Sequence, residues 1–168
     1  VYNTNEDLIG FKTNLDKMVK IAKQVDTPEA YFLIFPILAV YHIRIVNDIN
    51  LNDEDYYKHL DSVYQYNEKI VEIYEIQNEE FRKQNASSMS LYYSNFADVI
   101  IVKDNDQWQK ALATIDKSSQ LLLPTDTMSL AKNMHVKSRI LFNQKKYNEA
   151  RDQALKTVDL IAGYTGNS

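Results

Sequence analysis

Apolar side chains recur three or four residues apart along almost the whole of this 168-residue chain. Residues 5–24 show the pattern in Leu8, Phe11, Leu15 and Ala22, which would share one side of a helix. A β protein would need alternating apolar residues and many turns, yet the chain has only three glycines and three prolines. The spacing therefore predicts an all-α fold.

Breaks in this pattern divide the chain into seven expected helices. Thr27 can cap a helix that has Pro28 in its first position, and Asn52 or Asp53 can cap the following one. Residues 163–168 are expected to fray. The helices are predicted over residues 5–24, 28–48, 54–76 (with an extension to 84 left open), 88–103, 107–120, 126–143 and 146–162.

Two short apolar runs, 31–35 and 99–102, would suit a strand in isolation. Pro36 argues against a central strand at the first, because proline cannot donate to a sheet. The second has no neighbouring segment that could serve as a β partner. We therefore expect both to be helical, and we expect the helix over 28–48, apolar on nearly every side at its start, to be the most buried.

Two segments of the chain match each other in form. Trp108 is followed by Ala111 and Tyr147 by Ala150, and the two aromatic residues lie 39 positions apart. Such internal similarity is the signature of helical repeats. Residues 131–162 resemble a tetratricopeptide repeat, in which large, small and aromatic residues occupy fixed positions. Those positions are filled by Met134, Ser138, Leu141, Tyr147, Ala150 and Ala154, and the segment departs from the pattern at Lys137 and Thr157.

The resemblance implies a single domain over residues 1–168, built as stacked antiparallel hairpins in a right-handed superhelix. The hairpins would cover about 28–76, 92–125 and 131–162, with helix 5–24 as a cap or as part of a truncated repeat. Small residues such as Ala150 and Ala154 would let paired helices approach closely, and Tyr147 would plug the end of its hairpin.

The chain also resembles, in composition and arrangement, the C-terminal ligand-sensing part of the Rgg/PlcR-like peptide-responsive transcriptional regulators. It is poor in glycine, lacks cysteine and is rich in Tyr, Asn, Lys and Asp. This resemblance implies a cytoplasmic regulatory domain that senses a peptide. The helix-turn-helix of such regulators is not recognisable in this sequence, which starts at Val1, and we expect it to be a piece of a longer protein.

The sequence offers no pattern typical of an enzyme. None of His42, His59 and His135 has a second His or a Cys three or four residues away, as a zinc site would. The serines lack a Gly-x-Ser-x-Gly elbow, and the glycines are too few for a phosphate loop. We therefore expect no catalysis, no metal and no cofactor.

Charge is distributed unevenly along the chain. The net charge is −4 and the pI about 5.4, so we expect no direct nucleic-acid binding. Residues 53–85 carry a local balance of −5 and residues 131–157 one of +5. These are either solvated helix faces or surfaces for head-to-tail association or for an acidic ligand. The longest apolar run, 31–41, is too short for a membrane span.

In a stack of hairpins the first helix of each pair lines the concave face. Polar residues there would suit a short peptide or protein segment, because Asn and Arg hydrogen-bond backbone amides and carboxylates. The predicted ligand-binding residues are Arg44, Asn47, Tyr93, Asn95, His135, Arg139 and Asn143. The alternative is a structural scaffold or a dimerisation domain, forming a homodimer with no small ligand.

Overall fold

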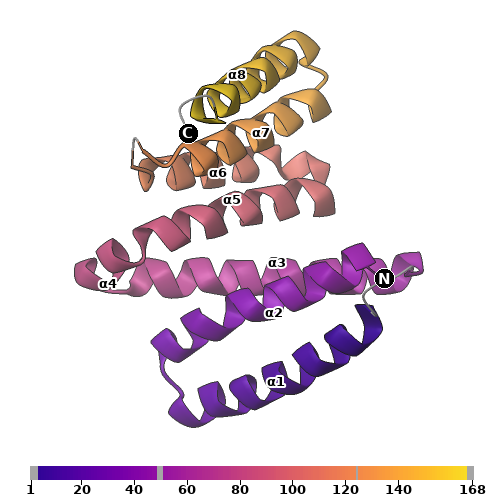
Figure 1. Cartoon of the computed structure of the whole chain (residues 1–168), viewed down its shortest axis with the longest axis vertical. Helices are drawn as coiled ribbons and strands as arrows, with labels where there is room; N and C mark the ends of the chain where they lie inside the picture. Colours follow the sequence, from indigo (N-terminus) through magenta and orange to yellow (C-terminus); the bar gives the residue numbers. More distant parts are fainter. Residues whose placement is uncertain (1–3, 49–50, 124, 166–168) are drawn as a thin grey trace. The chain divides into compact units, whose positions relative to one another are not determined.

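The computed structural model describes residues 4–48, 51–123 and 125–165. Within these ranges it contains eight α-helices, one short 3-10 helix and no strand, which confirms the predicted all-α fold (Figure 1). The helices are α1 (Thr4–Val25), α2 (Pro28–Asp48), α3 (Asp53–Ile76), α4 (Glu79–Gln84), α5 (Ala86–Lys103), η1 (Asn105–Gln107), α6 (Trp108–Gln120), α7 (Thr127–Asn143) and α8 (Tyr147–Thr165).

The helices group into two compact units, Val1–Gln77 and Asn78–Ser168. We call them the N-terminal unit and the C-terminal unit and describe each by itself. The expectation of one continuous domain and of a superhelix running through all hairpins stays a prediction. The three expected hairpins are present as helix pairs, α2 with α3, α5 with α6 and α7 with α8.

In the N-terminal unit, α2 packs against both α1 and α3. Local capping sets where its helices begin. The Thr27 hydroxyl accepts a hydrogen bond of 3.3 Å from the backbone N–H of Ala30, as expected for a cap before Pro28. Of the two candidates before α3, Asn52 is the cap, and its side chain accepts from the Asp55 N–H at 2.9 Å.

The core of the N-terminal unit joins α1 and α2 through the buried residues Leu15, Ala22 and Ile34. Aromatic rings connect α2 to α3, where Phe35 and Tyr66 stack with their centroids 5.7 Å apart. Such pairs add to the stabilisation from buried apolar area.

The expectation that helix 28–48 is the most buried element is wrong. Only 22% of the apolar stretch within Pro28–Asn47 is buried, whereas half of the residues of α5 are. The reason is exposure on one side of α2, where Leu33 and Val40 face solvent. Among the described residues, this segment alone is long and apolar enough to cross a bilayer by length and composition, criteria that core helices of soluble proteins and signal sequences also meet.

In the C-terminal unit, α7 packs against both members of the preceding hairpin, α5 and α6, and pairs with α8 (Figure 1). The best buried side chains come from α5, α6 and α7, and each is almost wholly inaccessible to solvent. They are Met89, Ile100, Ile115, Val136 and Ile140. The 3.6-residue spacing of the sequence therefore buries an apolar stripe of each of these helices.

The short helix α4 was not expected as a separate element. Asn78 begins it by accepting a hydrogen bond of 2.9 Å from the Phe81 N–H, so the chain breaks after α3 instead of continuing to residue 84. Between α7 and α8 the turn is closed by Lys145, which has a positive φ of 62°. The N–H groups of Lys145 and Lys146 donate to Phe142 and Leu141, the pattern of a Schellman C-cap.

Candidate functional site

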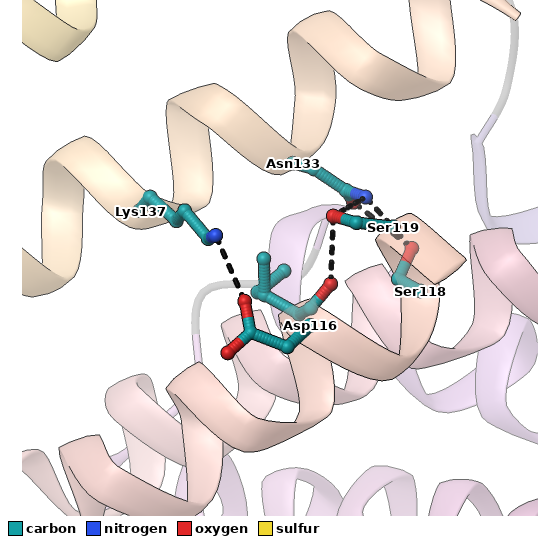
Figure 2. A network of polar contacts seen from close by, with 6 residues as sticks. Asp116, Ser118, Ser119, Asn133 and Lys137 are labelled. Carbon is teal, nitrogen blue, oxygen red and sulfur yellow. Dashed lines mark hydrogen bonds and ion pairs between the residues drawn. The ribbon is translucent and has the colours of Figure 1, made fainter. Parts of the chain in front are cut away.

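Helix α7 is fixed on α6 by a buried polar network (Figure 2). Asn133, only 2% exposed, donates through Nδ2 to the hydroxyls of Ser118 and Ser119 at 2.9 and 3.1 Å. The Ser118 hydroxyl in turn lies 2.7 Å from the backbone oxygen of Ser90 on α5. Since buried polar groups are costly when unpaired, this network fixes the register of α7 against the α5/α6 hairpin.

An ion pair extends the contact between α7 and α6 toward solvent. The Lys137 ammonium lies 2.9 Å from the Asp116 carboxylate (Figure 2). Lys137 is one of the two positions, with Thr157, at which the sequence departs from the tetratricopeptide pattern, which usually has leucine at the first. The structure supplies a physical role for the departure, because the lysine pairs with a carboxylate of the neighbouring helix.

Two further cations of α7 face α5. The Lys132 ammonium donates to the side-chain oxygen of Asn95, and Arg139 forms an ion pair with Asp98. Burial lowers the pKa of the Lys132 ammonium, and the nearby Asp98 carboxylate opposes this shift. Polar side chains thus form a row along α5 and α7, made of Asn95, Asp98, Lys132 and Arg139.

On the side of α7 that faces α8, two hollows follow each other along the helix pair. The first has a volume of about 420 Å³ and the second of about 490 Å³. Both are lined by Ala154, and together we call them the α7/α8 groove. Its lining consists of Met128, Ala131, Lys132, His135, Ser138, Arg139, Phe142, Asn143, Tyr147, Ala150, Arg151, Ala154, Thr157, Val158 and Ile161.

The surface that carries the α7/α8 groove is covered on the preceding hairpin. Trp108 and Tyr147 lie 39 residues apart, and the same offset aligns Ile115 on α6 with Ala154 on α8, and Ser119 with Val158. Ile115 is wholly buried, whereas Ala154 is exposed and Val158 is 61% exposed. On the α5/α6 hairpin this surface meets α7, and on the α7/α8 hairpin no described helix occupies it.

Four of the predicted ligand-binding residues lie in this region. His135, Arg139 and Asn143 line the α7/α8 groove, with His135 and Asn143 exposed. Asn95 lies beside it on α5, bonded to Lys132. Arg139 lines the groove and also forms an ion pair with Asp98. Part of its guanidinium is therefore already in contact with a residue of the C-terminal unit.

The expectation that Tyr93 lines a binding surface needs correction. Its side chain is 3% exposed, and the Lys117 ammonium lies 5.8 Å from the centroid of its ring. The stripe of α5 that holds Tyr93 also holds Phe96 and Ala97, which are buried as well. The phenol therefore packs inside the protein, where it gives a ligand almost no contact area.

Arg44 and Asn47 belong to α2 and thus to the N-terminal unit. Both are exposed. The Arg44 guanidinium lies 5.1 Å from the centroid of the Phe11 ring and 3.9 Å from the Asp7 carboxylate. These contacts hold it along the surface of α1, and its part in ligand binding stays a prediction.

The structure brings together two histidines that sequence reasoning treated separately. The Nδ1 atoms of His42 on α2 and His59 on α3 lie 2.7 Å apart. Partial burial is the larger cause that lowers the pKa of His42 to about 4, and the electrostatic effect of the neighbouring His59 is the smaller one. A search for short His spacings could not find a pair separated by 17 residues. Among the described residues, no third His, Cys, Asp or Glu completes a metal site with them.

An apolar hollow of about 500 Å³ lies between α1 and α2 of the N-terminal unit. Met18, Ile21, Val25 and Leu33 contribute exposed apolar surface to it, and Glu29 is its one charged residue. Periodicity reveals the apolar side of a helix without revealing whether anything covers it, so sequence spacing alone does not predict this hollow.

Comparisons with protein-family models, with curated proteins and with solved structures found no match.

Proposed function

We propose that this chain is a non-catalytic binding module whose C-terminal unit holds a short peptide or protein segment in the α7/α8 groove. The observation that carries the proposal is the lining of the groove. It combines exposed apolar and aromatic surface, including Phe142 and Tyr147, with the charged groups of Lys132, Arg139 and Arg151. Protein-binding sites commonly combine apolar anchors with a few polar groups that fix orientation.

A more specific proposal rests on the resemblance of the sequence to tetratricopeptide repeats and to the peptide-responsive regulators. The hairpins would be tetratricopeptide-like repeats, and the chain would be the cytoplasmic peptide-sensing part of a transcriptional regulator. The Trp108–Ala111 and Tyr147–Ala150 similarity supports the repeat. The proposed role requires no reaction, cofactor or metal, since affinity would come from contact area and hydrogen bonds alone.

The direct test is selection of peptide ligands from a random library. A phage-displayed library of random peptides is panned on the purified 168-residue chain, and the enriched peptides are synthesised and measured by isothermal titration calorimetry. We expect Asn143→Ala and Arg151→Glu to weaken these peptides about tenfold, which corresponds to about 1.4 kcal/mol. Lys156→Glu is the matched control, because Lys156 is exposed on α8 but does not line the groove.

The proposal fails if no peptide is enriched, or if the enriched peptides bind all groove variants as well as the original chain. Melting temperatures of the variants, followed by circular dichroism, separate loss of binding from loss of fold.

The apolar hollow between α1 and α2 favours a second candidate function, association between copies of the chain. Exposed apolar patches of this kind mark interaction surfaces. A charge placed in its lining, Leu33→Glu, should shift an oligomer toward the monomer in sedimentation equilibrium. A chain that is monomeric at all concentrations before the substitution would rule out this function.

A further inference from the structure

Helix α7 provides an internal template for how a helix binds to a hairpin in this fold. Its apolar residues Val136 and Ile140 are buried. Polar residues flank them, with Lys137 pairing to Asp116 on α6 and Arg139 to Asp98 on α5. The bound helix is thus amphipathic, and its charges are opposite to those on the hairpin that receives it.

The α7/α8 groove also combines apolar and charged side chains, but its charges have the opposite sign. In the α5/α6 hairpin the charged residues that pair with α7 are the carboxylates Asp98 and Asp116. The lining of the α7/α8 groove contains the cations Lys132, Arg139 and Arg151 and no carboxylate.

Two carboxylates outside the lining reach these cations but do not saturate them. Asp98 pairs with Arg139, and Asp152 lies 2.9 Å from the Arg151 guanidinium. A guanidinium has five N–H donors, so each arginine keeps donors for a further carboxylate. The two hollows run from Tyr147 to Ile161 along α8, a length of roughly 20 Å at 1.5 Å per residue.

We infer that the occupant of the α7/α8 groove is an amphipathic helix of a partner protein, about four turns long, with carboxylates flanking its apolar stripe. The inference rests on the proposed function and makes it specific. The apolar stripe would cover Phe142, Ala154 and Val158. The residues of α6 aligned with the last two are Ile115, which is buried, and Ser119, which bonds to Asn133 of α7. Carboxylates on its flanks would reach Arg139 and Arg151.

The test uses the full 168-residue chain and three fluorescein-labelled synthetic peptides of equal length, followed by fluorescence anisotropy. The first peptide is an alanine-based helix with leucines at i, i+4, i+7 and i+11 and glutamates on both flanks. The second carries lysines in place of the glutamates. The third has the composition of the first, with the leucines spread evenly around the helix.

We expect the glutamate-flanked peptide to bind at least about tenfold more tightly than either of the others, with an affinity that falls as salt is added. Arg151→Glu should weaken it about tenfold. Lys156→Glu makes the same charge change on the same helix outside the groove and should leave the affinity within about twofold of the original. Circular dichroism of the peptide with the chain should show a gain of helix.

Equal binding of the glutamate and lysine peptides would overturn the acidic partner. If the peptide with evenly spread leucines binds as tightly as the first peptide, the occupant is not an amphipathic helix. If none of the three binds while panned peptides bind in an Arg151-dependent way, the inference is wrong and the proposed function stands. If sedimentation shows that the chain associates with itself and that the glutamate peptide competes, the occupant is a second copy, and the partner protein is rejected.

Discussion

The guanidinium of Arg139 on α7 forms an ion pair with the carboxylate of Asp98 on α5, although both side chains also touch solvent. The pair links the two first helices of successive hairpins. One arginine therefore serves two roles, as a lining residue of the α7/α8 groove and as a contact within the unit.

This pair should contribute little to stability. Exposed ion pairs are typically worth about 0.2–1 kcal/mol, so Arg139→Ala and Asp98→Ala should each lower the free energy of unfolding by about 0.5 kcal/mol. A double-mutant cycle in urea measures their coupling. Asn143→Ala, which breaks no ion pair, is the control. A loss above about 2 kcal/mol for Arg139→Ala alone would make it chiefly a structural residue.

Two alanines of α8 should respond differently to enlargement. Ala150 is buried, so Ala150→Leu should destabilise the protein by about 1–3 kcal/mol through overpacking. The sequence pattern implied the same for Ala154, but this side chain is exposed in the α7/α8 groove, and Ala154→Leu should change stability by no more than about 0.5 kcal/mol. Denaturant midpoints of the two variants, compared side by side, test the difference; equal losses would mean that the groove is closed in solution.

Acid should destabilise the protein in part through His42. Its pKa is about 4 in the folded chain and near 6.5 in an unfolded one, so between these values the unfolded chain binds the additional proton. The free energy of unfolding should therefore fall as the pH is lowered from about 6.5 to about 4. Because the ring is only half buried, we expect a loss of about 1–2 kcal/mol from this group.

The measurement is a series of urea titrations across that pH range with His42→Gln and, as a control, His135→Gln. The first variant should show a shallower decline than the original chain. The His135→Gln variant, which replaces an exposed histidine outside the His42–His59 pair, reports the effect of the substitution itself. An unchanged slope in His42→Gln would show that the histidine pair does not couple folding to pH.

The turn between α7 and α8 should be improved by glycine. Lys145 adopts a left-handed conformation, φ 62°, that costs an L residue about 1–2 kcal/mol. Lys145→Gly should raise the free energy of unfolding by about 0.5–1 kcal/mol, since the gain exceeds the entropy that glycine adds to the unfolded chain. Lys146→Gly, one residue further, should give no gain. A destabilised Lys145→Gly would indicate that the lysine side chain stabilises the turn.

The hairpins could be predicted because their signals are local. Thr27 before Pro28, and Asn52 before α3, cap helices through contacts within three residues, and the apolar spacing marks the core side of each helix. The separate α4 was missed because the Asn78 cap lies inside a run of residues that also suits continuous helix.

The binding surface was less predictable because it depends on what lies opposite each helix. Ala150 and Ala154 occupy the same side of α8 in the sequence pattern, yet only the first is covered. Tyr93 looked like a surface residue, but the helices around α5 bury it. Sequence spacing assigns residues to a side of a helix, and packing decides whether that side meets another helix or solvent.

The contact between His42 and His59 also restricts where hydrogens can lie. With the two Nδ1 atoms 2.7 Å apart, one must carry a hydrogen and the other must offer its lone pair. The neutral rings are therefore held in complementary tautomers, one protonated at Nδ1 and the other at Nε2. Each ring thus dictates which nitrogen its neighbour presents to the surroundings, and exchanging the two roles requires hydrogens to move on both rings together.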